Sequence, residues 1–174
     1  MIEERRTNLI TNGQGQGASG TSPPTGWALE QGFGGLGFSS TSSMNNSSGY
    51  GAFQFSINGI TTTGNRLLIT PTGTRANVTA NTTYTVTWGA ALMSGSYPYG
   101  IQVVFIWYDS GGSFLSATLG TDRPSIAGFT RYTDTATAPA NATTLNVRFD
   151  FTGYGTIGTN ANFTMQLSGI QLEQ

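Results

Sequence analysis

The sequence predicts an all-β protein that folds as a single jelly-roll β-sandwich of about ten short antiparallel strands. The first observation behind this prediction is a set of short runs in which apolar and polar residues alternate, as in strands with one buried face. The second is that segments rich in Gly, Ser, Asn and Pro separate these runs. The third is that no window has apolar residues at the 3.6-residue spacing of a capped helix. Many short strands with Gly-rich turns are typical of sandwiches and jelly rolls.

The expected strands are distributed along the whole chain. The alternation is clearest around Phe53, Phe55 and Ile57, where polar residues face the other way. Two long segments, residues 12–26 and 32–49, are rich in Gly and Ser and are expected as loops. In chain order, the expected strands are residues 7–11, 27–31, 51–57, 66–70, 84–88, 101–108, 113–119, 129–137, 145–151 and 163–172.

Two local signals refine this pattern. Residues 109–112, Asp-Ser-Gly-Gly, follow the apolar run 101–108 and are typical of a hairpin turn. The alternation in the last strand changes phase at Ser168-Gly169, which indicates a β-bulge. The aromatic residues that alternate within strands are expected in the core, namely Phe53, Phe55, Trp88, Phe105, Phe149, Phe151 and Phe163.

Length and composition indicate one folded domain over residues 7–174, preceded by an arm at residues 1–6. Hydrophobic residues make up 37% of the chain and charged residues only 9%, with a net charge of −1. Because nucleic-acid binding needs a clustered positive surface, no nucleic-acid partner is expected. No apolar stretch approaches the ~20 residues of a membrane span, and the first residues lack the apolar region of a signal peptide. Membrane insertion is therefore not expected.

The residue types that carry most catalytic chemistry are missing. The chain has no Cys, no His and no Lys, so thiolate nucleophiles, imidazole bases and Schiff-base lysines are excluded. We therefore expect no enzyme activity, no cofactor and no metal site. A glycoside hydrolase with a carboxylate pair is kept as a third class of function. The acids are isolated and expected on the solvated surface, namely Glu30, Asp109, Asp122, Asp134, Asp150 and Glu173.

The arm and a group of tyrosines are the candidate functional residues. The arm carries Glu3, Glu4, Arg5 and Arg6, and it is either a frayed terminus or an attachment arm that docks on another protein.

Tyr97 and Tyr99 flank Pro98 in a Ser/Gly loop, and Tyr154 also lies among glycines. Exposed aromatic rings of this kind stack on the apolar faces of sugars. Three alternatives remain open for these tyrosines, which are binding of a glycan, burial in a subunit interface, and packing on the ends of the sandwich.

The order of several motifs resembles a known family. TNLITNG, a variable loop and Gly26-Trp27 resemble the start of carbohydrate-binding-module-like jelly rolls of the galactose-binding-like fold. TYTVTW, the turn after residue 108, APANA at residues 138–142 and the closing FTMQLSGIQLEQ continue the resemblance. RRTNL and IQLEQ also look like jelly-roll domains of tailed-phage virion proteins.

The resemblance implies a non-enzymatic virion protein of the head, neck or tail, used for decoration or for adhesion to a host surface polysaccharide. Its implied partners are other virion proteins and a host surface glycan. A homo-oligomer, with a trimer expected first, is predicted separately because few charges oppose close association of copies. Its implied location is the virion, assembled in the host cytoplasm. The alternative is a carbohydrate-binding module of a larger glycan-active enzyme.

Relatives in this family often hold a structural calcium with acids near the opening Asn-Gly and in the last strand. Here those stretches read Gln14-Gly15-Gln16 and Gln166-Leu167-Ser168. Because hard cations need negatively charged oxygen ligands, no metal is expected.

Overall fold

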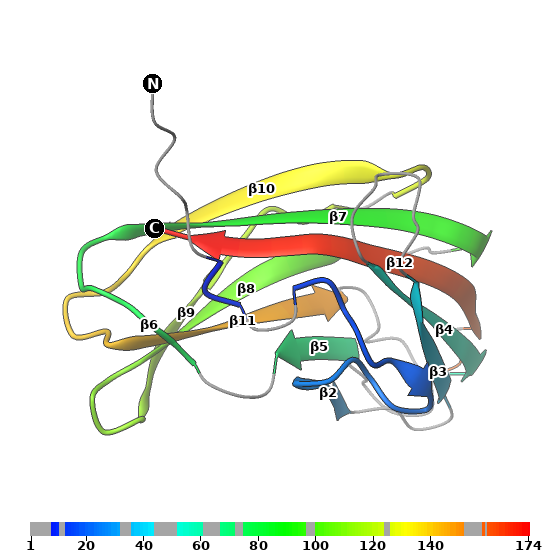
Figure 1. The fold of residues 1–174 in the computed structure, drawn as a ribbon, viewed down its shortest axis with the longest axis horizontal. Helices are drawn as coiled ribbons and strands as arrows, with labels where there is room; N and C mark the ends of the chain where they lie inside the picture. The colour runs from blue at the N-terminus through cyan, green and yellow to red at the C-terminus, as the bar shows by residue number, and fades with distance from the viewer. Residues whose placement is uncertain are drawn as a thin grey trace.

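The chain folds into two antiparallel sheets that pack face to face (Figure 1). The computed structural model describes residues 8–10, 13–31, 36–43, 52–60, 67–71, 75–96, 100–123, 126–151, 158 and 160–174. Sheet A has the order β1 (Ser19–Gly20), β3 (Leu36–Ser43), β4 (Ala52–Ile60), β12 (Asn160–Glu173), β7 (Thr83–Ser96) and β10 (Thr130–Thr137). Sheet B has the order β2 (Trp27–Gln31), β5 (Leu67–Pro71), β11 (Thr144–Phe151), β8 (Ile101–Tyr108) and β9 (Phe114–Leu119), with β6 (Ala76–Asn77) paired to β11.

The described residues form strands and no helix, which confirms the all-β sandwich. Among them there is accordingly no helix with the length and apolar character needed to cross a membrane.

The core lies between the sheets and is dominated by aromatic rings. In β7 the residues Tyr84, Val86 and Trp88 are at most 1% exposed, as the two-residue period requires. Trp88 packs edge-on against Phe149 of the other sheet with 5.3 Å between ring centroids. Burial of each large apolar side chain stabilises the fold by about 1.5–3 kcal/mol. The predicted core aromatics are all confirmed as buried, namely Phe53, Phe55, Trp88, Phe105, Phe149, Phe151 and Phe163.

The last strand, β12, changes its partner at the predicted bulge. Its register with β7 shifts between Ser168 and Gln171, and Gly169 has a φ of +55°. Glycine suits this bulge because it adopts the left-handed region without the strain of a Cβ. The Ile170 N–H donates to the Gly13 carbonyl at 3.0 Å. The ladder between β12 and β4 ends at Ser168, and beyond it the N-terminal segment bonds to β12 while β7 resumes its pairing at Gln171.

The structure corrects several boundaries. Residues 8–10 are not a strand, because Asn8 and its neighbours bond to β12 through single hydrogen bonds rather than a ladder. Leu36–Ser43, expected within a loop, is the strand β3 and pairs with β4 along its whole length. The short strands β1 and β6 were also not predicted. β7 and β12 are each 14 residues long, well beyond the alternating apolar runs that signalled them.

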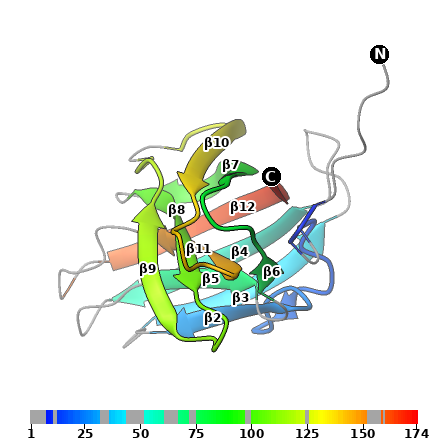
Figure 2. The same cartoon turned by 90° about the vertical axis from the view of Figure 1, so that its left-hand side faces the viewer.

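The two ends of the sandwich carry different connections. The arrows of β7 and β11 both point to the right in Figure 1, and Phe151 lies directly opposite Ile101 in the ladder. The turn between β8 and β9 lies at the opposite end, which Figure 2 views directly. That end view shows β9 at one edge of sheet B, beside β8.

Candidate functional site

Sheet B has an outer face that the core does not use. Ile101, Val103, Phe105 and Trp107 of β8 belong to the core between the sheets. The alternate residues of β8 point away from that core, and the register places residues of β9 and β11 beside them. The described side chains of this outer face are Gln102, Val104, Ile106 and Tyr108 on β8, Ala117 and Leu119 on β9, and Asn146, Arg148 and Asp150 on β11.

An apolar strip runs along the middle of this outer face. Val104 is fully buried and Ile106 is 7% exposed, although neither belongs to the core cluster. Leu119 lies opposite Val104 on the edge strand and is 63% exposed. The apolar centre of this face is therefore covered, and the open apolar side chain is Leu119 at the edge.

A paired charge borders the strip on the β11 side. Arg148 donates hydrogen bonds from both Nε and Nη2 to the carboxylate of Asp150, and the bond from Nη2 measures 2.9 Å. Both side chains are largely buried, with 19% and 11% of the side chain exposed. Because the two charges neutralise each other at close range, this border is polar and carries little net field.

Three side chains, Arg75, Tyr108 and Phe114, form a cluster at one end of the outer face, called here the Arg75 cluster. The rings of Tyr108 and Phe114 meet edge to face with 6.4 Å between centroids. The Arg75 guanidinium carbon lies 3.3 Å from the centre of the Tyr108 ring, a cation–π contact. Phe114 is 63% exposed. The exposed Phe114 ring and the Arg75 cation therefore both contact Tyr108.

The turn before Phe114 is rigid for reasons visible in its sequence. The Asp109 N–H donates to the Ser113 carbonyl at 3.0 Å, and the Asp109 carboxylate accepts from the Gly111 and Ser113 N–H groups at 2.9 and 2.8 Å. Gly112 has a φ of +79° and its carbonyl accepts from Arg75 at 3.0 Å. The predicted hairpin turn is thus confirmed, and it fixes where Phe114 stands.

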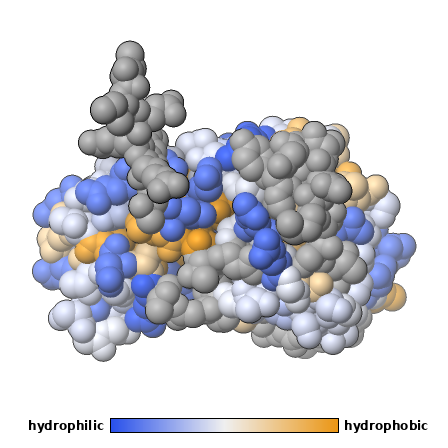
Figure 3. Space-filling model, in the orientation of Figure 1, coloured by the Kyte–Doolittle hydropathy of each residue, from blue (hydrophilic) through white to orange (hydrophobic). Residues whose placement is uncertain are grey.

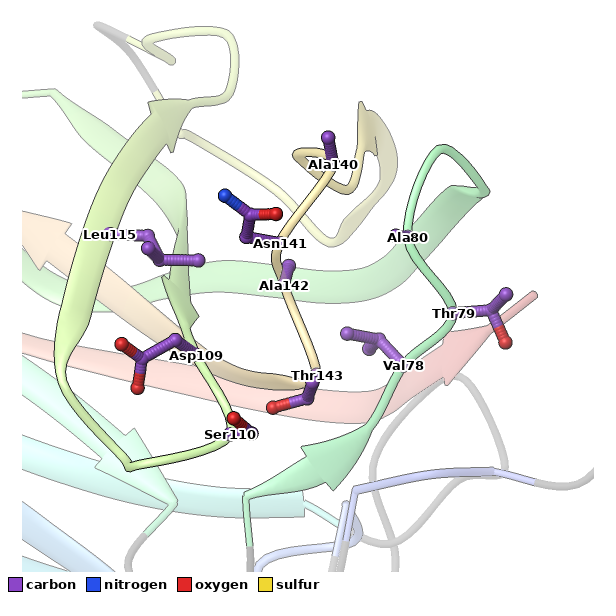
Figure 4. A pocket seen from close by; sticks show the side chains of 10 residues that line it. All are labelled: Val78, Thr79, Ala80, Asp109, Ser110, Leu115, Ala140, Asn141, Ala142 and Thr143. Carbon is purple, nitrogen blue, oxygen red and sulfur yellow. The ribbon is translucent and has the colours of Figure 1, made fainter.

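A hollow opens beside this turn at the same end of the sandwich (Figure 4). Its volume is about 710 Å³, and it is lined by Val78, Thr79, Ala80, Asp109, Ser110, Leu115, Ala140, Asn141, Ala142 and Thr143. Figure 4 shows Val78 and Leu115 turned toward each other across Ala142. Backbone bonds of 2.9 Å from Val78 to Thr143 and from Thr143 to Tyr108 hold its walls together. The hollow is thus a preformed feature with an apolar floor.

Two of the acids expected on the solvated surface are buried instead. Asp134 is 5% exposed and accepts hydrogen bonds from the Trp88 indole, the Thr121 N–H and Arg123 at 3.1, 2.8 and 3.2 Å. Asp150 is 8% exposed and is paired with Arg148. The prediction was wrong for Asp134 because its partners come from other segments of the chain, and wrong for Asp150 because its partner Arg148, two residues earlier on the same strand, was not considered.

The residues predicted as a site lie outside the part of the chain that the structure describes. This holds for Tyr97, Tyr99 and Tyr154 and for the arm residues Glu3, Glu4, Arg5 and Arg6. The flanking strand ends are described. Segment 97–99 joins β7 to β8, segment 152–157 follows β11, and Ile101 is the ladder partner of Phe151. The two tyrosine segments therefore leave the sandwich from adjacent strands, at the end away from the Arg75 cluster.

The stretches that replace the family's calcium acids do not fit a calcium ion. Gln14 and Gln16 are exposed, while Gln166 and Ser168 are buried, and these four offer amides and hydroxyls but no carboxylate. Across the described residues no group of three or more His, Cys, Asp or Glu gathers to hold a metal.

Known structures place this fold among carbohydrate-binding modules. No protein-family model and no curated protein sequence matches the chain. The CBM22-1 xylan-binding domain of Paenibacillus barcinonensis Xyn10C is similar, with a TM-score of 0.58 and 13% identity over 99% of this chain and 97% of that one. The family 11 carbohydrate-binding module of Clostridium thermocellum Lic26A-Cel5E has a TM-score of 0.56 and 9% identity over 99% and 96% of the two chains.

A phage protein shares the fold too. The enzymatically active domain of bacteriophage CBA120 tailspike protein 4 has a TM-score of 0.65 and 14% identity over 95% of this chain. The chain spans only 21% of that tailspike chain. The described part of this chain is thus a β-sandwich of the kind found in carbohydrate-binding modules, and at such low identity the likeness concerns the fold.

Proposed function

We propose that this chain is a non-catalytic glycan-binding domain that uses the outer face of sheet B. The observation that carries the proposal is Phe114, a ring 63% exposed on a turn held by the Asp109 carboxylate. A rigid aromatic ring gives a sugar face an apolar partner at low entropic cost. A second open apolar side chain, Leu119, lies further along the same edge strand and is also 63% exposed.

Polar groups beside the strip match the hydroxyls of a saccharide. Gln102 and Asn146 lie on the same outer face and are partly exposed, and amides both donate and accept hydrogen bonds. In the view of Figure 3, hydrophilic and near-neutral residues cover most of the coloured surface, and the largest group of hydrophobic residues lies left of the centre, with smaller groups at the right. One stacked ring gives an affinity of about 4 kcal/mol, near a millimolar Kd. Useful adhesion then depends on several copies acting together.

The tyrosine segments remain a second proposed contact region. Tyr97, Tyr99 and Tyr154 belong to segments that follow or precede the adjacent strands β11 and β8, and in this proposal they share one glycan platform. Their alternative role is burial against a neighbouring subunit. The described strand ends that flank these segments lie at the opposite end of β8 from Phe114. Variants in the tyrosine segments and at Phe114 therefore test different parts of the protein.

A virion setting is the second candidate function, and the similarity to a phage tailspike domain favours it. In this proposal the domain is displayed on the head, neck or tail and adheres to a host polysaccharide, with the arm at residues 1–6 attached to another virion protein. A carbohydrate-binding module of a larger enzyme is supported equally by the xylan-binding neighbour. Detection of the protein in fixed copy number on purified particles would favour the first, and a catalytic domain in the same polypeptide the second.

The proposal is tested by affinity electrophoresis of the purified protein in gels that contain single polysaccharides. Phe114→Ala is expected to weaken retardation at least severalfold without lowering the melting temperature. Met93→Ala is the matched control, because Met93 is an apolar side chain of sheet A that is 51% exposed. Tyr97→Ala with Tyr99→Ala tests the other end. Unchanged retardation of the Phe114 variant would remove the outer face of sheet B from consideration.

A further inference from the structure

We propose that the Arg75 cluster recognises the carboxylate of an acidic sugar, with Arg75 binding the carboxylate and Phe114 supporting the sugar ring. This inference rests on the proposed glycan-binding function and specifies the substrate class. The sugar is a uronic acid or a residue of similar chemistry, in which one carboxylate is attached to an otherwise polyhydroxylated ring.

Arg75 differs from Arg123 and Arg148 in its described contacts. Arg123 is paired with Asp134 and Arg148 with Asp150. For Arg75 the described contacts are the Gly112 carbonyl at 3.0 Å and the Tyr108 ring, and neither carries a negative charge. A guanidinium has five N–H donors, so this hydrogen bond leaves donors directed outward. The cation is therefore fixed in place while its charge is uncompensated by the described residues.

The geometry prepares this guanidinium for a carboxylate. Stacking on Tyr108 occupies a face of the planar group, and the bond to Gly112 fixes its rotation. The edge of the fork stays accessible, since Arg75 is an exposed residue. Arginine binds carboxylates through two parallel N–H donors in the guanidinium plane. Because the fork is already ordered, less side-chain entropy is lost on binding.

The surroundings favour contact with one carboxylate-bearing sugar residue at a time over simultaneous contact with several adjacent charges. Phe114, which is 63% exposed and packs edge to face on Tyr108, offers surface for ring stacking. A nucleic acid or a highly sulfated chain needs several adjacent cations. Here the net charge of the whole chain is −1, and Asp109 lies in the same turn. One cation beside one open ring matches one charged sugar residue.

The competing explanation is that Arg75 only clamps the turn. That role predicts lower stability in Arg75 variants and equal losses for every glycan. A charge-recognising role predicts a loss confined to acidic glycans. The two are separated by probes that differ only in the carboxyl group.

The experiment uses polygalacturonate, alginate and hyaluronan, each beside its carboxyl-reduced form, with the full chain and affinity electrophoresis in low salt. At least one acidic polymer is expected to bind roughly three- to tenfold more tightly than its reduced form. Arg75→Gln is expected to abolish that preference. Arg75→Lys keeps the charge but loses the fork and is expected to lose most of it. Phe114→Ala is expected to weaken both forms.

The outcomes separate the two proposals. Equal binding of acidic and reduced forms, or a preference that survives Arg75→Gln, overturns the acidic-sugar inference and leaves glycan binding standing. A melting temperature lowered in Arg75→Gln with equal losses for both forms identifies a clamp and likewise overturns it. Absence of binding to all six polymers and to a panel of neutral polysaccharides overturns both.

Discussion

The indole N–H of Trp88 donates a hydrogen bond of 3.1 Å to the carboxylate of Asp134 inside the sandwich. The same carboxylate accepts from Thr121 and Arg123, so a single acid ties the edge strand β10 to a central tryptophan and to the segment after β9. Gly120 leaves room for it, since a Cβ there would lie 2.9 Å from Asp134 Oδ1. We assign this network a structural role, which is to hold β10 and the segment after β9 at the edge of the sandwich.

Asp134→Asn is expected to destabilise the fold by about 3–5 kcal/mol, because Arg123 loses its counter-charge and an amide N–H2 group faces backbone and indole donors. The measurement is urea unfolding followed by tryptophan fluorescence. Thr135→Ala is the control, since Thr135 is exposed and adjacent, and its effect is expected within about 0.5 kcal/mol. Equal midpoints for both variants would contradict the anchoring role.

Asn8→Ala is expected to lower stability by about 1–3 kcal/mol, since the side chain makes three hydrogen bonds. Its amide donates to the Ile170 carbonyl at 2.9 Å and its oxygen accepts from the Ile10 and Leu172 N–H groups at 3.0 and 2.9 Å. Hydrogen exchange at Leu172 is expected to accelerate. Gln14→Ala, at an exposed position, serves as the control. An unchanged exchange rate of the Leu172 amide in Asn8→Ala would show that Asn8 does not hold the end of β12 in place.

Gly15→Ala and Gly20→Ala form a matched pair that separates backbone strain from steric clash. Both glycines have positive φ, +67° and +58°. A Cβ at Gly15 would lie 2.4 Å from the Phe53 ring, whereas one at Gly20 meets nothing within 4 Å. Gly20→Ala is expected to cost about 1–2 kcal/mol from strain alone, and Gly15→Ala about 1–3 kcal/mol more. Thermal melting measures both, and equal losses would show that Phe53 relaxes freely.

Removal of divalent cations is expected to leave the melting temperature unchanged. The amides and hydroxyls at Gln14, Gln16, Gln166 and Ser168 do not supply the negative oxygen ligands that calcium prefers. The measurement is calorimetry with and without a chelator, followed by added calcium. A fall in melting temperature that calcium reverses would disprove this expectation.

Self-association is expected, with a trimer as the first state to look for. The motivation is that only 9% of the residues in the chain are charged, so electrostatic repulsion opposes close contact between copies only weakly. Light scattering coupled to size exclusion measures the mass over a range of concentrations. A strict monomer at the highest concentration, together with absence from purified particles, would refute the expectation.

The sequence by itself determined the fold class, the buried faces of the strands and the core aromatics. It also located the turn at Asp109 and the bulge at Ser168-Gly169. These features are local, because a two-residue apolar period and the turn preferences of Gly and Asp act over a few neighbouring residues. Local sequence patterns also predicted the turn and the strand that carry part of the candidate binding surface on sheet B. Phe114 directly follows the turn, which places it at the start of an exposed edge strand.

The tertiary structure alone decided which polar residues meet. β3 has few large apolar side chains and is a strand because β4 offers it a hydrogen-bonding edge. Asp134 is buried because Trp88 and Arg123 arrive from other segments. Arg75 reaches Gly112 across 37 positions of sequence. Such pairings depend on strand order and register, and these follow from packing the whole chain into two sheets rather than from any local pattern.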